Sequence, residues 1–554
     1  MNIFQIPRFD SFFIFRRVIN LKNEADKIIL YLPNKIPIDK QLLNIGFAQA
    51  TIAFSRTFSS SFPQASLHTE KYRWVFFEPE PNYWMVFLIK NASNTQAKES
   101  KKNEKFKYEF TNDNCLFQAL RKGYYMFSLF YHSFNHLITN YSLEELRNKV
   151  NQFFSFFIPT VDFIQTSLKK RLLSLFQGIR YYPLDKNMFL KVYCFVNMIE
   201  SSFSKIKHSI FLYGSNLIWS SLNLSDTNSL YNFLCGYINP KPAVENEYLV
   251  GIEEFFIGKT ASPQLPQPKN YFNWSLEDIS KLPQNPDLFN YPELVFHITQ
   301  TIAKARSNFS DFITGPKLDS KKNFFLPKIF VGNEEKKQHV LLIYKANKVI
   351  FCLLVEPDEK LQTMSFYNQM KKRIETEIET IVNNLFKSEH ILQISSQNEL
   401  LYKFLYFNEM NLALKETLSM CKEFELRHQF LMYLSSIVDS FYNSERLFIN
   451  QEKRYFQLKN IEQQTKAQNQ ENNKDPIENN LDSQKQTQTE KYVNLDQNLI
   501  EVTTNINNSL WIVMKRAGSR LILMLVENQN LNISNISKEV DKLNAEFFRT
   551  IYLN

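Results

Sequence analysis

The chain has 554 residues, of which 44% are hydrophobic and 22% are charged, and its net charge at pH 7 is +9. This composition excludes a disordered chain, and the length predicts three or four domains. Only ten residues are glycine, which argues against glycine-rich loops that hold phosphate groups. The sequence contains no helix dense in lysine and arginine, so it does not indicate binding to nucleic acid.

The cysteines and the hydropathy predict where the protein resides. Five widely spaced cysteines in apolar surroundings are typical of free thiols in a reducing compartment. The N-terminus lacks a secretory signal pattern, and no apolar run reaches the ~18 residues of a membrane span. We therefore expect a cytoplasmic protein whose contact with an anionic membrane is peripheral.

The first third of the chain predicts a strand pair at 11–15 and 27–32, then a helix at 39–56. Strands follow at 67–77 and 83–90, joined by a turn at 78–82. Further helices are expected at 114–131 and 142–157. The small residues Gly46, Ala50 and Ala53 recur along one side of the first helix. They either pack on their own sheet or lie at an interface between domains.

The middle of the chain is organised around residues 208–234. They predict a strand, a tight turn at 214–216, a second strand and a helix capped by Ser225 or Asp226. Helices at 163–177 and 184–206 precede this stretch. A proline-rich insertion at 239–290 follows it. A helix is then expected at 293–305, strands at 310–317, 328–331, 340–345 and 349–356, and a charged helix at 361–387.

The last third begins again with a strand, at 402–407, and predicts a hairpin of strands at 510–515 and 520–527. Helices are expected at 425–456 and 534–549, and a polar insertion rich in Gln and Asn at 461–498. Each third thus repeats a strand pair followed by helices and more strands. The pattern predicts an α+β fold of mainly antiparallel sheets with helices layered on both faces.

No motif of nucleotide binding, metalloprotease, serine hydrolase or calcium binding is present, so we expect no catalytic residue, cofactor or metal. His132 and His136 share a helical face, but without a third ligand they are expected to be ordinary helix residues. His68 is expected to be structural or interfacial. Trp84 either fills the core or, beside Met85, anchors a partner at an exposed rim.

Several segments together resemble the Ccz-one family of vacuolar fusion proteins. They are FFIFRR at 12–17, SLHTEK at 66–71, FFEPEPNYWMVFLIKN at 76–91, FLYGSNLIWSSL at 211–222 and LWIVMKRAGSRLILML at 510–525. The resemblance implies three longin domains, each with a five-stranded antiparallel sheet. We place these domains at 8–165, 207–395 and 400–554, with connecting helices at 166–206.

The resemblance also implies a function. Members of the family pair with a Mon-one-type triple-longin subunit, and the heterodimer is a guanine-nucleotide exchange factor for the late-endosomal GTPase Rab-seven. The first longin domains form the GTPase platform, so one subunit alone is expected to be inactive. The alternatives are a sibling triple-longin protein, such as the inturned planar-polarity effector or the Hermansky–Pudlak subunit, and a trafficking scaffold without exchange activity.

The resemblance transfers no fixed catalytic residue, so the interface is predicted from sequence position. The helix with Gly46, Ala50 and Ala53 is expected at the subunit junction. The strands that carry His68, Thr69, Trp84 and Met85 are expected near the GTPase platform.

Overall fold

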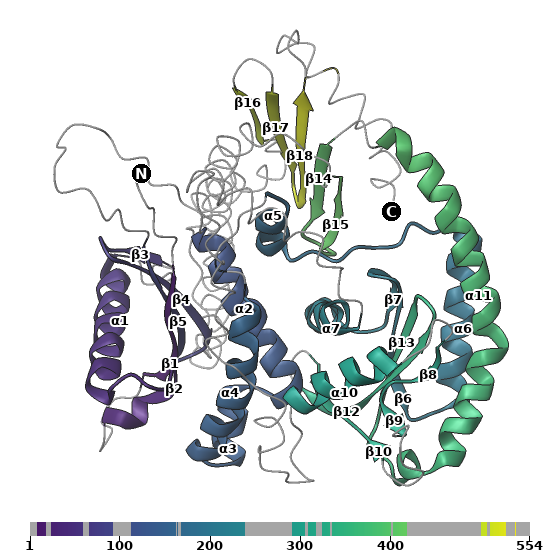
Figure 1. Ribbon diagram of the computed structural model, residues 1–554, viewed down its shortest axis with the longest axis horizontal. Coiled ribbons are helices and arrows are strands. Elements are labelled where there is room, and N and C mark those ends of the chain that lie inside the picture. Colours follow the sequence, from purple (N-terminus) through teal and green to yellow (C-terminus); the bar gives the residue numbers. More distant parts are fainter. Residues whose placement is uncertain are drawn as a thin grey trace, which may run out of the picture. The chain divides into compact units, whose positions relative to one another are not determined.

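The computed structural model describes the parts of the chain that form its three sheets and their helices (Figure 1). The predicted insertions at 239–290 and 461–498, the helix at 425–456 and nearly all of the helix at 534–549 lie outside the described residues. The described residues are 8–17, 24–58, 66–91, 112–161, 163, 168–238, 291–304, 309–316, 324–332, 335–399, 403–417, 500–506, 510–527 and 538.

The first sheet has five antiparallel strands in the order β2-β1-β5-β4-β3. Their bounds are β1 Arg8–Arg16, β2 Ile28–Leu32, β3 Ser66–His68, β4 Tyr72–Glu80 and β5 Tyr83–Lys90. The strand predicted at 67–77 is therefore two strands, because the chain turns back between them. The last strand in the sequence, β5, lies in the middle of the sheet and is paired on both sides.

The second sheet follows the same order, β7-β6-β13-β12-β11 from edge to edge, and all its pairs are antiparallel. It differs from the five strands expected because a sixth strand, β8, pairs with the end of β12. The bounds are β6 Ile206–Tyr213, β7 Asn216–Ser220, β8 Ser310–Phe312, β11 Lys328–Val331, β12 Lys337–Ala346 and β13 Val349–Val355. A small separate ladder joins β9 Gly315–Pro316 to β10 Phe324–Phe325.

The third sheet repeats the arrangement in the order β15-β14-β18-β17-β16. Its strands are β14 Lys403–Asn408, β15 Ala413–Glu416, β16 Ile500–Ile506, β17 Leu510–Ala517 and β18 Arg520–Glu527. One strand order thus occurs three times, which confirms the expected class of fold. By compactness the chain divides into two units, one holding the first two sheets and the other most of the third.

Helices cover both faces of the first sheet because its strands alternate apolar side chains to both sides. Helix α1 (Ile38–Phe58) covers one face, where the Phe47 ring lies 4.8 Å from that of Trp74. Helices α2 (Asp113–Tyr131) and α4 (Leu143–Phe157) cover the other, where Phe12 meets Phe154 at 5.2 Å. Ser142 caps α4 as expected, its Oγ accepting from the Glu145 amide at 3.1 Å.

The second sheet is also covered by helices. Helix α7 (Leu224–Tyr237) is capped by Asn223, which accepts from the amide of Asp226; the prediction of Ser225 or Asp226 as the cap was wrong by a few residues. Helix α6 (Lys186–Ser202) belongs to the core, since Phe195 packs on Phe351 at 5.3 Å, although residues 166–206 were predicted as connecting helices. The bounds are α5 Leu168–Phe176, α6 Lys186–Ser202, α7 Leu224–Tyr237, α10 Tyr291–Lys304 and α11 Met364–Glu399, with a short α3 at Phe134–Asn140 and 3₁₀ turns at Glu24–Lys27, Ile158–Thr160 and Glu359–Gln362.

Helix α2 packs against elements of both the first and the second sheet. Its Phe127 stacks on Phe154 at 5.8 Å, while its Phe130 meets Phe233 of α7 at 4.9 Å. Its Ser128 hydroxyl accepts a hydrogen bond of 2.7 Å from the Lys336 amine. The apolar residues of the two sheets that face α2 form one continuous core.

Among the described helices, none is both long enough and apolar enough to cross a membrane.

Candidate functional site

The outward side of α1 is an exposed face of apolar and small residues. Positions three and four apart on a helix share a side, and this spacing joins the three small residues predicted from the sequence to four larger apolar ones. On the opposite side of the helix, Ile45 and Ala48 are buried. We call the exposed side the α1 outer face; it consists of Leu43, Gly46, Phe47, Ala50, Ala53, Phe54 and Phe58. Of these, Phe47 is partly exposed and also contacts Trp74 of the sheet.

Several large apolar side chains of the α1 outer face are mostly exposed to solvent. Leu43 is 71% exposed, Phe54 67% and Phe58 77%. A Cβ atom added at Gly46 would meet nothing within 4 Å. Contiguous exposed apolar surface is a mark of interaction sites, and small residues let another backbone come close. The small residues thus face outward and do not pack on their own sheet.

The α1 outer face is held in place by polar and aromatic contacts on the inner side. The Asn44 amide donates to the Tyr31 hydroxyl at 2.6 Å, and that hydroxyl donates to Ser11 at 3.3 Å. The ring of Tyr31 stacks on Phe13 at 5.2 Å, with the planes 3° apart. These contacts join α1 to β1 and β2, so the exposed face sits on a rigid support.

Trp84 and Met85 lie in the core of the first sheet, 1% and 0% exposed. Both are on β5, the central strand, where Trp84 pairs with Phe15 and Met85 with Ile14. Because side chains alternate along a strand, Trp84 points to the α1 side and Met85 to the α2 side. The prediction that these two residues form an exposed rim was wrong, and the alternative of a core position holds.

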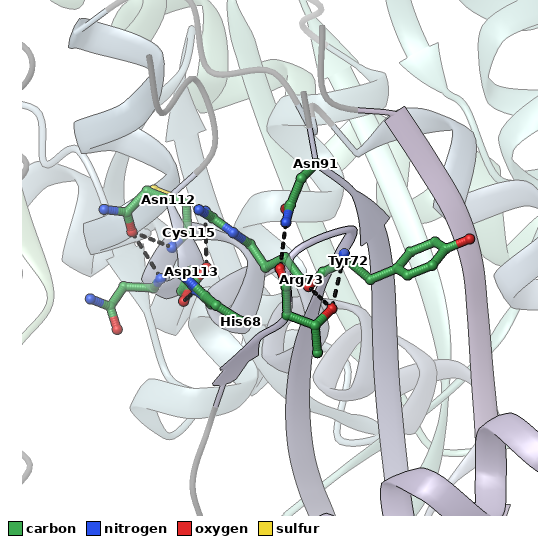
Figure 2. Close-up of polar contacts among 9 residues, drawn as sticks. His68, Tyr72, Arg73, Asn91, Asn112, Asp113 and Cys115 are labelled. Carbon is green, nitrogen blue, oxygen red and sulfur yellow. Dashed lines mark hydrogen bonds and ion pairs between the residues drawn. The ribbon is translucent and has the colours of Figure 1, made fainter. Parts of the chain in front are cut away.

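His68 is the last residue of edge strand β3 (Figure 2). Thr69 follows it in the turn that leads to β4. The Thr69 hydroxyl donates to the Tyr72 carbonyl at 2.8 Å and accepts from the Tyr72 amide at 3.0 Å, which closes the turn. The Asn91 amide group donates to the Thr69 carbonyl at 2.8 Å. Thr69 therefore has a structural role here.

Asp113, in the first turn of α2, lies between His68 and Arg73 (Figure 2). One carboxylate oxygen is 2.5 Å from His68 Nε2 and the other 3.0 Å from an Arg73 amino group. Burial raises the pKa of Asp113, but the hydrogen bond to His68 and the charge of Arg73 lower it more, so the net pKa lies below its usual range. We call His68, Arg73 and Asp113 the β3 clamp, because they hold the edge strand to α2.

The β3 clamp is a structural link, because the polar groups of its three residues are directed at one another. No local sequence pattern predicts this cluster, because Asp113 follows His68 by 45 positions. The only local signal was the cap at Asn112, whose side chain accepts from the amides of Asn114 and Cys115 at 2.8 and 3.2 Å.

The seven predicted interface residues are not gathered into one surface. Gly46, Ala50 and Ala53 form part of the α1 outer face, and Trp84 is buried beneath that helix. Met85 and His68 lie toward α2. Of the predicted set, only the α1 residues are placed where another protein could reach an apolar surface.

His132 and His136 stack on each other, with ring centroids 3.6 Å apart. Burial, the neighbouring His136 and Lys336 lower the pKa of His132 to about 4, so that imidazole is neutral at pH 7. Within the described part of the chain, no group of three potential metal ligands is found.

Comparisons with known proteins place this fold. A family model described as the first longin domain of INTU, CCZ1 and HPS4 matches residues 9–132, and one described as Intu longin-like domain 2 matches residues 206–380. The first match contains β1 to β5, α1 and α2, and the second contains the second sheet. The chain is thus a longin-domain protein.

Individual relatives narrow the assignment. A vacuolar fusion protein CCZ1 homolog from Nematostella vectensis is 32% identical over 418 residues, covering 74% of this chain and 80% of the relative. Homologs of the same name from Xenopus tropicalis and Dictyostelium discoideum are 26% and 22% identical, covering 99% and 96% of this chain and 97% and 94% of their own lengths. The chain belongs to the CCZ1 family of vacuolar fusion proteins, which supports a role in membrane trafficking.

Proposed function

We propose that this chain is one subunit of a heterodimeric guanine-nucleotide exchange factor. With a Mon-one-type subunit it promotes GDP release from a Rab-seven-type GTPase, in traffic from endosomes to the vacuole or lysosome. The complex is recruited peripherally to an anionic endosomal membrane. Membership of the CCZ1 family supports the setting, and the α1 outer face supports the need for a partner.

The α1 outer face carries the proposal. Its exposed Leu and Phe side chains are of the kind that dominates binding energy when a partner buries them. Gly46, Ala50 and Ala53 would let a partner helix approach the α1 backbone. We therefore assign the Mon-one-type subunit to this face.

The exchange mechanism needs differential binding and no chemistry by this chain. A GTPase releases nucleotide faster when a second protein binds its nucleotide-free state more tightly than its nucleotide-bound state. A rigid platform supplies that preference, and the first sheet has such a build under α1. The isolated chain lacks half of the platform and is expected to leave GDP release unchanged.

The experiment compares two substitutions at helical glycines. Gly46 on α1 and Gly236 on α7 are both exposed, and a Cβ at either position would meet nothing within 4 Å. Gly46→Arg places a long charged side chain in the proposed junction, whereas Gly236→Arg places the same side chain elsewhere. Both proteins should fold, since replacing a helical glycine by arginine raises helix propensity.

We expect Gly46→Arg to weaken association with a purified Mon-one-type subunit at least roughly tenfold, a loss of about 1.4 kcal/mol. GDP release from a Rab-seven-type GTPase should fall with it, while Gly236→Arg should match the unmodified chain. Equal behaviour of the two variants would refute the assignment of the face. A pair that assembles but leaves GDP release unchanged would show a scaffold.

A further inference from the structure

A cavity of about 340 Å³ lies among helices α2, α5 and α7 of the first compact unit. It is separate from the α1 outer face and plays no part in the proposed exchange mechanism. Its volume lies at the lower end of the range of small-molecule sites, about 300 to 1,000 Å³. The cavity is therefore large enough for a small organic ligand.

The charged residues that line this cavity are basic. They are the α2 residue Lys122 and the residue Arg180, and no carboxylate is found among the lining residues that the structure describes. Among the described residues, no hydrogen bond or ion pair of the Lys122 amine is found. The thiol of Cys235, which also lines the cavity, interacts electrostatically with this amine.

The Lys122 amine is desolvated, and the part of the chain that the structure describes supplies no counter-ion for it. Burial lowers its pKa, and the Cys235 thiol opposes this shift. Lys122 retains some accessible surface because it borders the cavity. A charged amine held away from water destabilises a fold unless an opposite charge comes near it. A bound anion would supply that charge.

The cavity also has apolar lining residues, among them Phe157, Val161, Leu173 and Leu414. A hydrated inorganic ion would leave these side chains unused. An organic anion would pair its charged group with Lys122 and bury its carbon skeleton against them, which removes apolar surface from water.

We propose that this cavity binds a small organic anion, whose phosphate or carboxylate group pairs with Lys122 and whose apolar part lies against Phe157 and Leu173. The Ser174 hydroxyl lines the same space and can donate a hydrogen bond to the anionic group. The anion comes either from a free metabolite or from the headgroup of a lipid.

The test uses the full chain and three probes of similar size: phenyl phosphate, benzoate and the neutral benzyl alcohol. Binding is measured by calorimetry and by the shift in melting temperature. We expect at least one of the two anions to bind at least tenfold more tightly than benzyl alcohol. Failure of both anions to exceed the alcohol would overturn the proposal.

Substitution of the amine tests the site. Lys122→Met should weaken binding of the anion at least tenfold. Its matched control is Lys345→Met, since Lys345 on β12 is also half-buried, with a pKa lowered by burial, but does not line the cavity. Lys345→Met should bind the probe normally. Equal losses in the two variants would overturn the proposal.

A second variant removes the cavity but leaves the amine in place, in case Lys122→Met does not fold. Ser174→Leu fills the space from α5 and should reduce binding of the anion to a similar extent. Unchanged binding in this variant would refute the site.

Binding of the protein to vesicles that carry a phosphatidylinositol phosphate then distinguishes the two sources of the ligand. Lys122-dependent binding to them supports a lipid headgroup, and binding of the soluble probe alone supports a free metabolite.

Discussion

Helices α1 and α7 hold equivalent places beside the first two sheets, since each follows the first strand pair of its sheet. Their apolar residues differ in burial, because those of α7 are buried and several of α1 are exposed. In α7, Leu230, Phe233 and Leu234 are 0% exposed, and Phe233 packs on Phe130 of α2. In α1, Phe54 and Phe58 are more than half exposed. Helix α2 of the same chain covers α7, whereas the described elements of the chain leave the apolar side of α1 exposed.

This difference teaches where a partner is needed. A repeated fold offers the same helix in each copy, and the copies diverge in what covers it. The covered helix contributes to the stability of the chain, while the exposed one contributes to stability only after another protein has buried it.

The largest effect should come from the covered helix. Phe233→Ala removes a fully buried ring and should lower the free energy of unfolding by about 3–5 kcal/mol. Phe54→Ala on α1 should change it by less than about 0.5 kcal/mol, because that ring is mostly in water. Urea denaturation of the isolated chain measures both. Similar losses in the two variants would mean that α1 is covered within its own chain.

Trp84→Ala tests the support beneath the exposed helix. The indole is 1% exposed on the central strand, so its loss should also lower the free energy of unfolding by about 3–5 kcal/mol. Trp84→Phe should retain part of this free energy. Denaturation curves distinguish a core residue from a partner anchor, since an anchor would leave the curves unmoved and weaken only subunit association.

The β3 clamp should contribute a smaller and pH-dependent share. Asp113→Asn removes the negative charge that lies 3.0 Å from the mostly buried Arg73 and should lower the free energy of unfolding by about 1–3 kcal/mol at pH 7. The pKa of Asp113 is lowered by folding, so its carboxylate stabilises the fold above the ordinary value of about 4. That stability is lost as the pH falls through the lower pKa of the folded state.

Denaturation between pH 7 and 3 measures the effect of Asp113→Asn. The difference from the unmodified chain should shrink below about pH 4. Asp185→Asn is the control, because Asp185 caps α6 without a side-chain hydrogen bond to the helix. A difference that stays constant with pH would contradict the role given to the Asp113 charge.

The smallest expected effect sharpens the comparison of the two helices. Gly46→Ala and Gly236→Ala should each raise the free energy of unfolding by about 0.5–1 kcal/mol, since alanine favours a helix and both positions are open. Thermal melts should show the same gain for both. A loss at Gly46 alone would mean that its backbone is already in close contact within the chain.

Most of the fold could be predicted from the sequence, because hydrophobic periodicity and turn residues mark its elements directly. The tight turn at Gly214 and the hairpin at Gly518 have the positive φ angles, 59° and 57°, that glycine favours. The sequence did not separate β3 from β4. That turn depends on the Thr69 side chain and not on glycine or proline.

The surface was harder to predict than the fold. The spacing of Gly46, Ala50 and Ala53 identified one side of α1, but the large neighbours Leu43 and Phe54 were missed. The spacing of apolar residues along a helix does not show which of them are exposed to solvent. Trp84 could not be assigned from its sequence context, because burial follows from pairing on both sides of β5. Lys122 gave no signal, as its isolation depends on segments far apart in the chain.

The position of α2 has a consequence for how the molecule melts. One helix contributes to the cores of both sheets. The two sheets are therefore separate in strand pairing but share one hydrophobic core. Severing the chain near residue 165 would strip α7 of Phe130 and Lys336 of Ser128. The two sheets should therefore lose their structure together in a single cooperative transition, and neither half should persist as an independent piece.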